Sequence, residues 1–253
     1  MGIISPIDFT GRKILITGAS SGIGRATAVY FSKLGASLVI TGRDENRLQE
    51  TLRQMDGQGH LVFPFDLAEQ DDYAPLFDAA VADGIKLDGL VHSAGITYIM
   101  PLKSLTKKRL HEVMNVNFYS FVELARNYAK NKYAAGGSIV GMSAAMLLKP
   151  RAYELGYMAS KAALEMSVRV LAHELSDRGI RVNAVMPGNV RTPMMEKVLD
   201  EYGTWEKTNA GVEKTLIHRW ETPEDIAGCC AFLMSDMAGI ITGRILYADG
   251  GVI

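Results

Sequence analysis

A tyrosine and a lysine four residues apart, Tyr157 and Lys161 in the segment "GYMASK", are a pair whose types and spacing could do chemistry. A tyrosine hydroxyl ordinarily has a pKa near 10, and a neighbouring cation lowers that pKa by stabilising the phenolate. In a helix, residues i and i+4 share a face, so the pair could act as a proton donor and its electrostatic partner. Two ordinary residues on a helix face have the same spacing, so the assignment needs a cofactor site and a second hydroxyl.

A glycine-rich turn, "TGASSGIG" at 17–24, supplies a candidate cofactor site. It lies between an apolar strand pattern at 13–17 and a helical pattern at 22–34, and its glycines are Gly18, Gly22 and Gly24. Glycine at a strand-to-helix junction lets the backbone approach a pyrophosphate, whose charge the helix N-terminus favours. A simple tight turn is the alternative, but the position between the first strand and first helix favours nucleotide binding.

The elements that must position these residues alternate along the chain. Apolar strand patterns are followed by amphipathic helical patterns, which predicts a mostly parallel sheet covered by helices on both faces, a doubly wound α/β fold of the Rossmann type. We expect one domain over 1–253, with a substrate lid at 189–215 where strand signal is lacking. The seven predicted strands are 13–17, 37–41, 60–66, 88–94, 137–143, 181–187 and 244–250, and clear helical patterns include 22–34, 107–130, 155–177 and 223–234.

Composition narrows the class of protein. The chain has 253 residues, of which 48% are hydrophobic and 22% charged, with a net charge of −1 and no basic block that would favour nucleic acid or an anionic membrane. Its only cysteines, Cys229 and Cys230, are adjacent and offer no disulfide framework. The start "MGIISPIDFTGRK" lacks the features of a signal peptide, and no apolar run approaches a membrane span of about 20 residues. We therefore expect a cytoplasmic protein that binds neither nucleic acid nor membrane, and no metal ion.

Seven short motifs, spread over most of the chain, resemble those of the short-chain dehydrogenase/reductase family, in its compact single-domain form similar to 3-oxoacyl-carrier-protein reductases. They are "TGASSGIG" (17–24), "FDL" (65–67), "HSAG" (92–95), "NVNF" (115–118), "GMSA" (141–144), "YMASK" (157–161) and "PGNVRT" (187–192). The resemblance implies a catalytic set of Asn117, Ser143, Tyr157 and Lys161. In it Tyr157 exchanges a proton with the substrate oxygen, Ser143 hydrogen-bonds that oxygen, Lys161 also holds the nicotinamide ribose, and Asn117 anchors a water that relays protons through Lys161.

The same resemblance implies a set of cofactor contacts. Asp66 and Leu67 correspond to the segment that meets the adenine, and Thr192 to the residue that bonds the nicotinamide carboxamide. The full implied set is Gly18, Ser20, Ser21, Gly22, Ile23, Gly24, Arg43, Asp66, Leu67, Ser93, Ala94, Gly95, Tyr157, Lys161, Pro187, Gly188, Val190 and Thr192.

The end of the second strand favours NADP over NAD. Family alignment places Gly42 where NAD enzymes carry a carboxylate for the ribose 2′-hydroxyl, and Arg43 follows. A guanidinium could bind a 2′-phosphate, whereas a solvated surface arginine is the alternative. Asp44 is better explained as a helix cap. Ser20 and Ser21 weaken the argument, because many NADP-preferring relatives carry a second basic residue there.

Several residues have competing interpretations. The family turn usually begins with asparagine, but here it reads His92-Ser93-Ala94-Gly95, and we expect His92 to be structural and Ser93 to replace some asparagine bonds. Asn117 could be a buried amide bonded to backbone, and Ser143 a strand-end turn serine. Residues 194–205 suit an amphipathic helix that closes over a partly apolar pocket, or one that packs on a neighbouring subunit.

The sequence thus predicts an NADP(H)-dependent oxidoreductase that transfers a hydride between nicotinamide and a small-molecule carbonyl or secondary alcohol. Reduction of 3-oxoacyl thioesters is one candidate, weakened by His173 where many such reductases carry arginine. A non-catalytic dinucleotide-binding redox sensor is the alternative, and a sugar-nucleotide epimerase or dehydratase is disfavoured by the glycine spacing. Relatives are commonly tetramers or dimers, so we expect a homo-oligomer, with the segment 244–253 suited to an interface.

Overall fold

The structure is a computed structural model that describes residues 7–69 and 72–251. The expectation that the first residues carry no targeting signal rests partly on residues 1–6, which lie outside the described residues. The last two residues of the predicted interface segment 244–253 also lie outside them.

One seven-stranded parallel sheet forms the centre of the molecule, as predicted. Its strand order is β3-β2-β1-β4-β5-β6-β7. Strands β2 and β3 are added on one side of β1, and β4 to β7 are added on the other side, beginning with β4 beside β1. This reversal between β1 and β4 is the topological switch point at which doubly wound sheets bind ligands. The strands are Lys13–Thr17 (β1), Ser37–Gly42 (β2), Leu61–Pro64 (β3), Leu87–His92 (β4), Ala134–Met142 (β5), Ile180–Pro187 (β6) and Ile245–Ala248 (β7).

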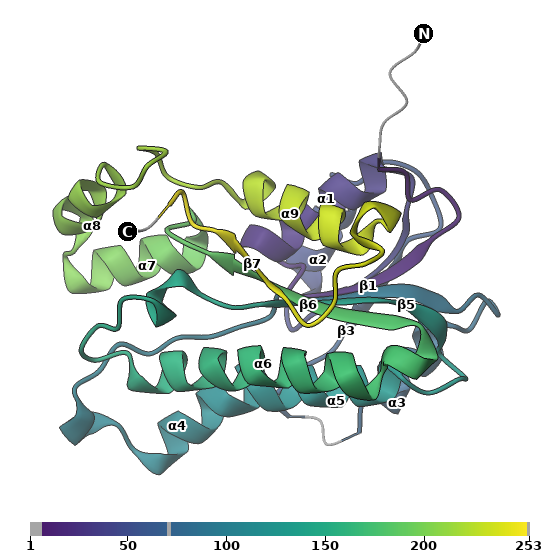
Figure 1. Cartoon of the computed structure of the whole chain (residues 1–253), viewed down its shortest axis with the longest axis horizontal. Coiled ribbons are helices and arrows are strands. Elements are labelled where there is room, and N and C mark those ends of the chain that lie inside the picture. The colour runs from purple at the N-terminus through teal and green to yellow at the C-terminus, as the bar shows by residue number, and fades with distance from the viewer. Residues whose placement is uncertain (1–6, 70–71, 252–253) are drawn as a thin grey trace, which may run out of the picture.

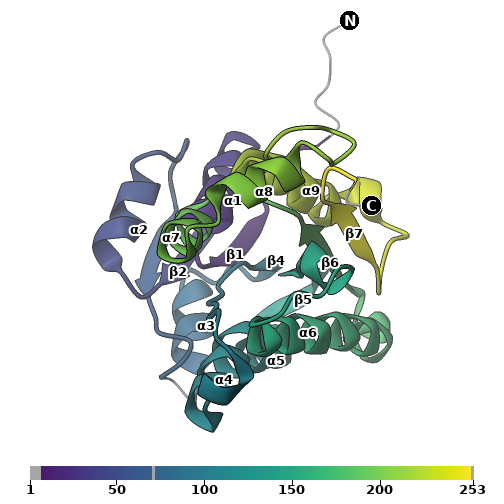
Figure 2. The ribbon, with the colours of Figure 1, turned by 90° about the vertical axis from the view of Figure 1, so that its left-hand side faces the viewer.

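Helices cover both faces of the sheet, which explains why its central strands are apolar throughout (Figures 1 and 2). On one face a core cluster that includes Phe77, Phe121 and Leu164 packs under three helices, Ala74–Ala80 (α3), Ser120–Tyr128 (α5) and Leu155–Glu174 (α6). On the other face a cluster that includes Phe31, Leu48 and Ile226 packs under Gly22–Lys33 (α1), Glu45–Leu52 (α2) and Pro223–Met234 (α9).

Two helix boundaries differ from the predicted ones for identifiable reasons. The helical pattern at 107–130 is an α-helix, Lys107–Met114 (α4), that passes through a π-helical turn at Asn115–Tyr119 into α5. The predicted helix at 194–205 is two helices, Pro193–Tyr202 (α7) and Trp205–Val212 (α8). Gly203 ends α7 with φ of 60°, a left-handed C-terminal cap that glycine adopts without steric cost.

Helix starts follow the expected capping chemistry. Thr222 and Asp225 form a reciprocal capping box at the start of α9. The Asp44 side chain accepts a hydrogen bond from the Arg47 N–H at 3.1 Å and caps α2, which confirms its predicted role. Within residues 7–69 and 72–251, no helix is both long enough and apolar enough to cross a membrane.

Candidate active site

The glycine turn after β1 lies against the end of β4 at the switch point. A Cβ built on Gly18 would come within 2.6 Å of the Ala94 nitrogen, and one on Gly24 would overlap the Gly18 carbonyl. Gly18 also has φ of 68°, a conformation that side chains other than glycine rarely adopt. The turn therefore needs these glycines for its own packing, and it leaves main-chain groups at the N-terminus of α1, where a phosphate would be favoured.

His92 is a structural residue that ties the two central strands to a helix. It is fully buried, its Nδ1 lies 2.9 Å from the Thr17 hydroxyl and its Nε2 lies 3.4 Å from the Ser120 hydroxyl. Because Ser120 donates its own proton to the Val116 carbonyl, the network assigns the ring proton to Nε2. Burial first, and then the charge of Lys161, lower the His92 pKa to about 3, so the ring stays neutral. His92 thus makes the inter-element bonds that we expected Ser93 to supply.

Asn117 joins the loop after β4 to helix α6. Its Oδ1 accepts a hydrogen bond from the Ile96 N–H at 2.8 Å, and its Nδ2 donates to the Ile96 carbonyl at 3.0 Å and to the Ser160 hydroxyl at 2.9 Å. Ser160 in turn donates to the Tyr157 carbonyl at 2.6 Å. These bonds use both amide hydrogens of Asn117 and one of the two acceptor sites of its Oδ1. Asn117 lies in the π-helical turn, a distortion that often marks functional sites.

Tyr157 and Lys161 lie on one face of α6, as predicted. The Lys161 Nζ is 5.6 Å from the centre of the Tyr157 ring and donates to the Met142 carbonyl at 2.8 Å. Burial lowers the Lys161 pKa to about 8. The Tyr157 pKa, however, is raised to about 12 by burial and by the charge of Glu154, so the lowering expected from Lys161 is not found. Burial outweighs the cation here, because Nζ faces the ring and the Met142 carbonyl.

The hydroxyl of Ser143 is occupied by a carboxylate. Ser143 is buried at the end of β5, and its Oγ donates a hydrogen bond to Glu165 Oε1 on α6. Glu165 follows Tyr157 by eight residues, which is about 12 Å along a helix axis, and side chains lean toward the helix N-terminus. To bond a substrate oxygen beside Tyr157, Ser143 must therefore exchange this partner. Glu165 was not among the residues predicted for the site, because it belongs to none of the recognised motifs.

The end of β2 carries an exposed, unpaired guanidinium. No ion pair joins Arg43 to a carboxylate in the part of the chain that the structure describes, whereas Asp44 caps α2 and pairs with Arg47 at 3.4 Å. A Cβ on Gly42 would lie 3.5 Å from the Ser20 hydroxyl of the glycine turn. Ser20 and Arg43 thus border the same strand end, a suitable arrangement for an anion.

The remaining predicted cofactor contacts border the same edge of the sheet. Asp66 accepts the Ala68 N–H at 2.8 Å in the turn after β3. Thr192 caps α7, and its Cγ2 would lie 3.3 Å from a Cβ on Gly22, so α7 starts against the glycine turn. Val190 bridges to Glu221 just after the Pro187-Gly188 turn. Figure 2 shows α7 and α8 in front of the sheet when the molecule is viewed from this end.

A buried carboxyl, Glu221, lies between α8 and α9 and is bridged to Val190. Glu221 is 7% exposed, its Oε2 has no hydrogen-bond partner among the described residues, and its Oε1 would lie 2.6 Å from a Cβ on Gly188. Burial, with further contributions from the neighbouring charges of Asp249 and Asp225, raises the Glu221 pKa to about 7. A larger residue at Gly188 would displace this carboxyl.

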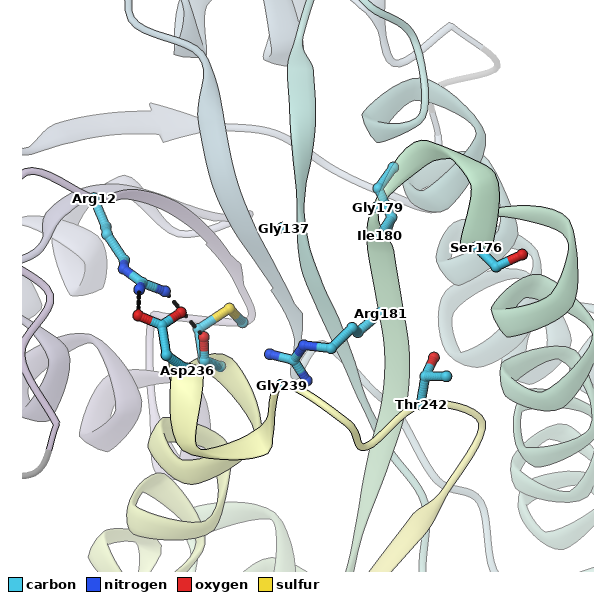
Figure 3. A pocket seen from close by; sticks show the side chains of 10 residues that line it. Arg12, Gly137, Ser176, Gly179, Ile180, Arg181, Asp236, Gly239 and Thr242 are labelled. Carbon is cyan, nitrogen blue, oxygen red and sulfur yellow. Dashed lines mark hydrogen bonds and ion pairs between the residues drawn. The ribbon is translucent and has the colours of Figure 1, made fainter.

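A cavity of about 430 Å³ lies at the opposite edge of the sheet, where the strands begin (Figure 3). Its two guanidinium groups have partners within the protein. Arg12 pairs with Asp236 at 2.5 Å, and Arg181 donates to the carbonyls of Leu233, Ser235 and Ile241 at 2.8–3.2 Å. These bonds tie the turn after α9 to the start of β6, so we interpret the cavity as structural.

Comparisons with known proteins agree with this geometry. Residues 18–253 match the family model described as enoyl-(acyl carrier protein) reductase. The chain belongs to the short-chain dehydrogenase/reductase family. It is 35% identical to glucose 1-dehydrogenase of Gluconobacter oxydans, with 96% of this chain and 92% of the relative covered. It is 33% identical to 3-oxoacyl-[acyl-carrier-protein] reductase of Rickettsia conorii, with 98% and 99% covered. A putative short-chain alcohol dehydrogenase from Sinorhizobium meliloti superposes with a TM-score of 0.88 at 32% identity, covering 98% of each chain.

In this short-chain dehydrogenase/reductase the site is built from groups that a dinucleotide needs. The glycine cradle at Gly18 and Gly24, the anion-accepting strand end at Arg43 and the lysine on α6 fit such a cofactor. Among residues 7–69 and 72–251, no group of three His, Cys, Asp or Glu side chains could hold a metal ion.

Substitution of Ser143 distinguishes its two roles. If Ser143 acts on the substrate oxygen, Ser143→Ala should lower kcat by about 10- to 100-fold, because a hydrogen bond to developing charge contributes about 1.5–3 kcal/mol. The kcat of Ser143→Ala is to be measured in steady-state kinetics and compared with the kcat of Glu165→Gln. A Ser143→Ala enzyme with kcat within about threefold of wild type would show that Ser143 serves only to bind Glu165.

Replacement of Glu221 should stabilise the protein in a pH-dependent way. The Glu221 pKa rises from 4.5 in the unfolded chain to about 7 in the folded one, so the buried carboxyl destabilises the folded state as pH rises through this window. Glu221→Gln should therefore raise Tm more at pH 8 than at pH 5, as thermal melts at both pH values can show. Equal shifts at the two pH values would contradict this.

Proposed function

We propose that this chain is an NADP(H)-dependent oxidoreductase that interconverts a small-molecule carbonyl compound and its secondary alcohol, with Tyr157 as the general acid and base. The observation that carries the proposal is that the segment after β4 lies against both parts of the site. A Cβ on Gly18 would come within 2.6 Å of the Ala94 nitrogen, and a Cβ on Gly95 would lie 3.8 Å from Lys161 Nζ. A bound nicotinamide supplies or accepts the hydride. The protein's own residues bind it, orient the substrate and move the proton.

In the direction of reduction, the Tyr157 hydroxyl gives its proton to the substrate oxygen as that oxygen gains negative charge. A pKa near 12 keeps Tyr157 protonated before the reaction, which suits a proton donor. In the reverse direction the tyrosinate takes the proton back from the alcohol. Lys161, which lies on the same helix face, would hold the nicotinamide ribose.

Asn117 and Ser143 complete the proposed catalytic set in different ways. Because both amide hydrogens of Asn117 are bonded to Ile96 and Ser160, a relay water would donate its hydrogen bond to an oxygen of Asn117. Ser143 would reach the substrate oxygen by releasing Glu165.

The proposed binding of NADP rests on Arg43 and Ser20 at the end of β2. The rest of the proposed cofactor set is the one that the family resemblance implies, from Gly18 to Thr192. The lid at 189–215 would cover the site, and Tyr202 of α7 already donates a hydrogen bond across to the Ile99 carbonyl at 2.6 Å. The relatives act on different substrates by name, a sugar and an acyl thioester, so similarity alone does not set the substrate.

We further propose a cytoplasmic homo-oligomer, a tetramer or a dimer. Exposed apolar side chains near the carboxyl end support an interface there: Tyr247 on the edge strand β7 is 56% exposed, and Met237 and Ile240 in the preceding turn are 54% and 97% exposed. A redox sensor without turnover remains the alternative function, and loss of activity in a tyrosine variant would exclude it.

Tyr157→Phe tests the reaction. It should retain NADPH binding, measured by fluorescence titration, and lose at least about 99% of kcat, because general acid–base catalysis contributes about 100- to 10,000-fold. Lys161→Ala should weaken both nucleotide binding and turnover. Activity near that of wild type in Tyr157→Phe would overturn the proposed function.

Arg43→Ala tests the nucleotide preference. Loss of a charge-assisted bond to the 2′-phosphate should raise the Kd for NADPH by about 10- to 100-fold and change the Kd for NADH by less than about twofold. Arg47→Ala, an exposed arginine in the first turn of α2, is the matched control. Equal effects of Arg43→Ala on both nucleotides would show that Arg43 is an ordinary surface residue.

A further inference from the structure

A second buried carboxyl without a partner lies immediately before Tyr157. Glu154 is 7% exposed, and its Oε2 makes no hydrogen bond within the described residues. Burial raises the Glu154 pKa, an effect that the charge of Arg151 partly offsets. A buried polar group without a partner costs free energy, so such groups are rare in folded proteins and call for an explanation.

Glu154 lies next to the reacting group. It precedes α6 by one residue and Tyr157 by three, on the helix face that carries Tyr157 and Lys161. After burial, the charge of Glu154 is the second cause of the raised Tyr157 pKa. Glu165 lies eight residues after Tyr157 on α6 and accepts the Ser143 hydroxyl from the end of β5, whereas Glu154 precedes Tyr157 at the other end of this stretch.

The backbone holds Glu154 in this place at a conformational cost. Tyr153 has φ of 75°, which is unfavourable for a residue with a side chain, and its carbonyl accepts the Met100 N–H at 2.8 Å. The Glu154 carbonyl accepts the Met158 N–H at 3.0 Å. Strained backbone and a buried carboxyl without a partner therefore adjoin each other one turn from the catalytic tyrosine. Both are typical of binding sites that are prepared for a ligand.

We propose that Glu154 is a specificity-determining residue whose carboxylate accepts a hydrogen bond from a hydroxyl group on the carbon next to the reacting one. The substrate class is a neutral vicinal diol or, in the reduction direction, an α-hydroxy ketone. This inference rests on the proposed function, and it names the substrate class of that same site.

Charge favours a neutral hydroxyl over an ammonium group as the donor. Arg151 already acts on Glu154, and the buried Lys161 lies on the same helix face, so a substrate cation would meet two positive charges. A substrate carboxylate beside Glu154 would be repelled by it. A hydroxyl gives the carboxylate its missing donor and adds no charge.

Three alcohols that differ only at the neighbouring carbon test the proposal: cyclohexanol, trans-cyclohexane-1,2-diol and trans-2-aminocyclohexanol, each oxidised with NADP⁺. Wild-type kcat/KM should be at least about tenfold higher for the diol than for cyclohexanol, the effect expected of a hydrogen bond to a charged group. In Glu154→Leu this ratio should fall to within about twofold of one. In Glu154→Gln, which retains one acceptor oxygen, it should be intermediate.

Thermal stability separates this role from a structural one. Because Glu154→Leu removes a buried carboxyl without a partner, its Tm should rise by about 2 °C or more. Glu174→Leu, an exposed carboxylate at the far end of α6, is the matched control, and it should change neither the Tm nor the ratio of the two kcat/KM values. A lower Tm for Glu154→Leu would show that the carboxyl supports the fold and would overturn the proposal.

The remaining outcomes separate this inference from the function on which it rests. Equal kcat/KM for cyclohexanol and the diol in wild type, with the ratio unchanged in Glu154→Leu, would overturn the inference and leave the oxidoreductase function intact. Preference for the amino alcohol over the diol would overturn the choice of a hydroxyl. Failure of wild type to oxidise any alcohol or reduce any ketone with either nucleotide would overturn the proposed function itself, and the inference with it.

Discussion

The contact on which the site depends is the close approach of the turn after β1 to the end of β4. Adjacent parallel strands lie about 4.8 Å apart. The turn that follows β1 must therefore pass close to the end of the neighbouring strand β4 without pushing that strand away. Gly18 permits this, because a Cβ there would overlap the Ala94 backbone. Since the strand order reverses between β1 and β4, the same contact opens the crevice in which doubly wound proteins bind their ligands. Tyr157, Lys161 and Asn117 then approach that crevice from helices on one face of the sheet.

Buried polar side chains connect the strands, loop and helices of the site by hydrogen bonds. His92 joins Thr17 of β1 to Ser120 of α5, and Asn117 joins the loop after β4 to Ser160 of α6. Each of these groups has its hydrogen bonds satisfied, so the network is rigid as well as polar. Two carboxyls depart from this rule, Glu154 three residues before Tyr157 and Glu221, which is bridged to Val190 after β6. Their desolvation reduces the stability of the folded state near the proposed site, in keeping with the trade-off between stability and function.

Local patterns were sufficient for much of this description. Apolar strand runs, amphipathic helical spacing and capping residues such as Thr222 and Asp44 depend on neighbours in the sequence, and all reappear in the structure. The predicted helix at 194–205 was too long. The apolar spacing continues past Gly203, but in the structure Gly203 adopts a left-handed conformation that ends α7. The bonding of Ser143 could not be predicted, because Glu165 reaches it only through the packing of α6 on β5.

The doubly wound sheet, the glycine cradle and the tyrosine–lysine pair could be inferred from the chain alone, because strand and helix periodicity, turn chemistry and i,i+4 spacing are local properties. The family resemblance added Asn117 and Ser143 to that pair. The contacts that those residues make depend on how the whole chain folds. The structure showed that His92 supplies the bonds between strands, that Ser143 is held by Glu165, and that burial together with Glu154 raises the Tyr157 pKa to about 12. Protonation and hydrogen bonding depend on desolvation and on partners distant in the chain, and neither is set by spacing along it.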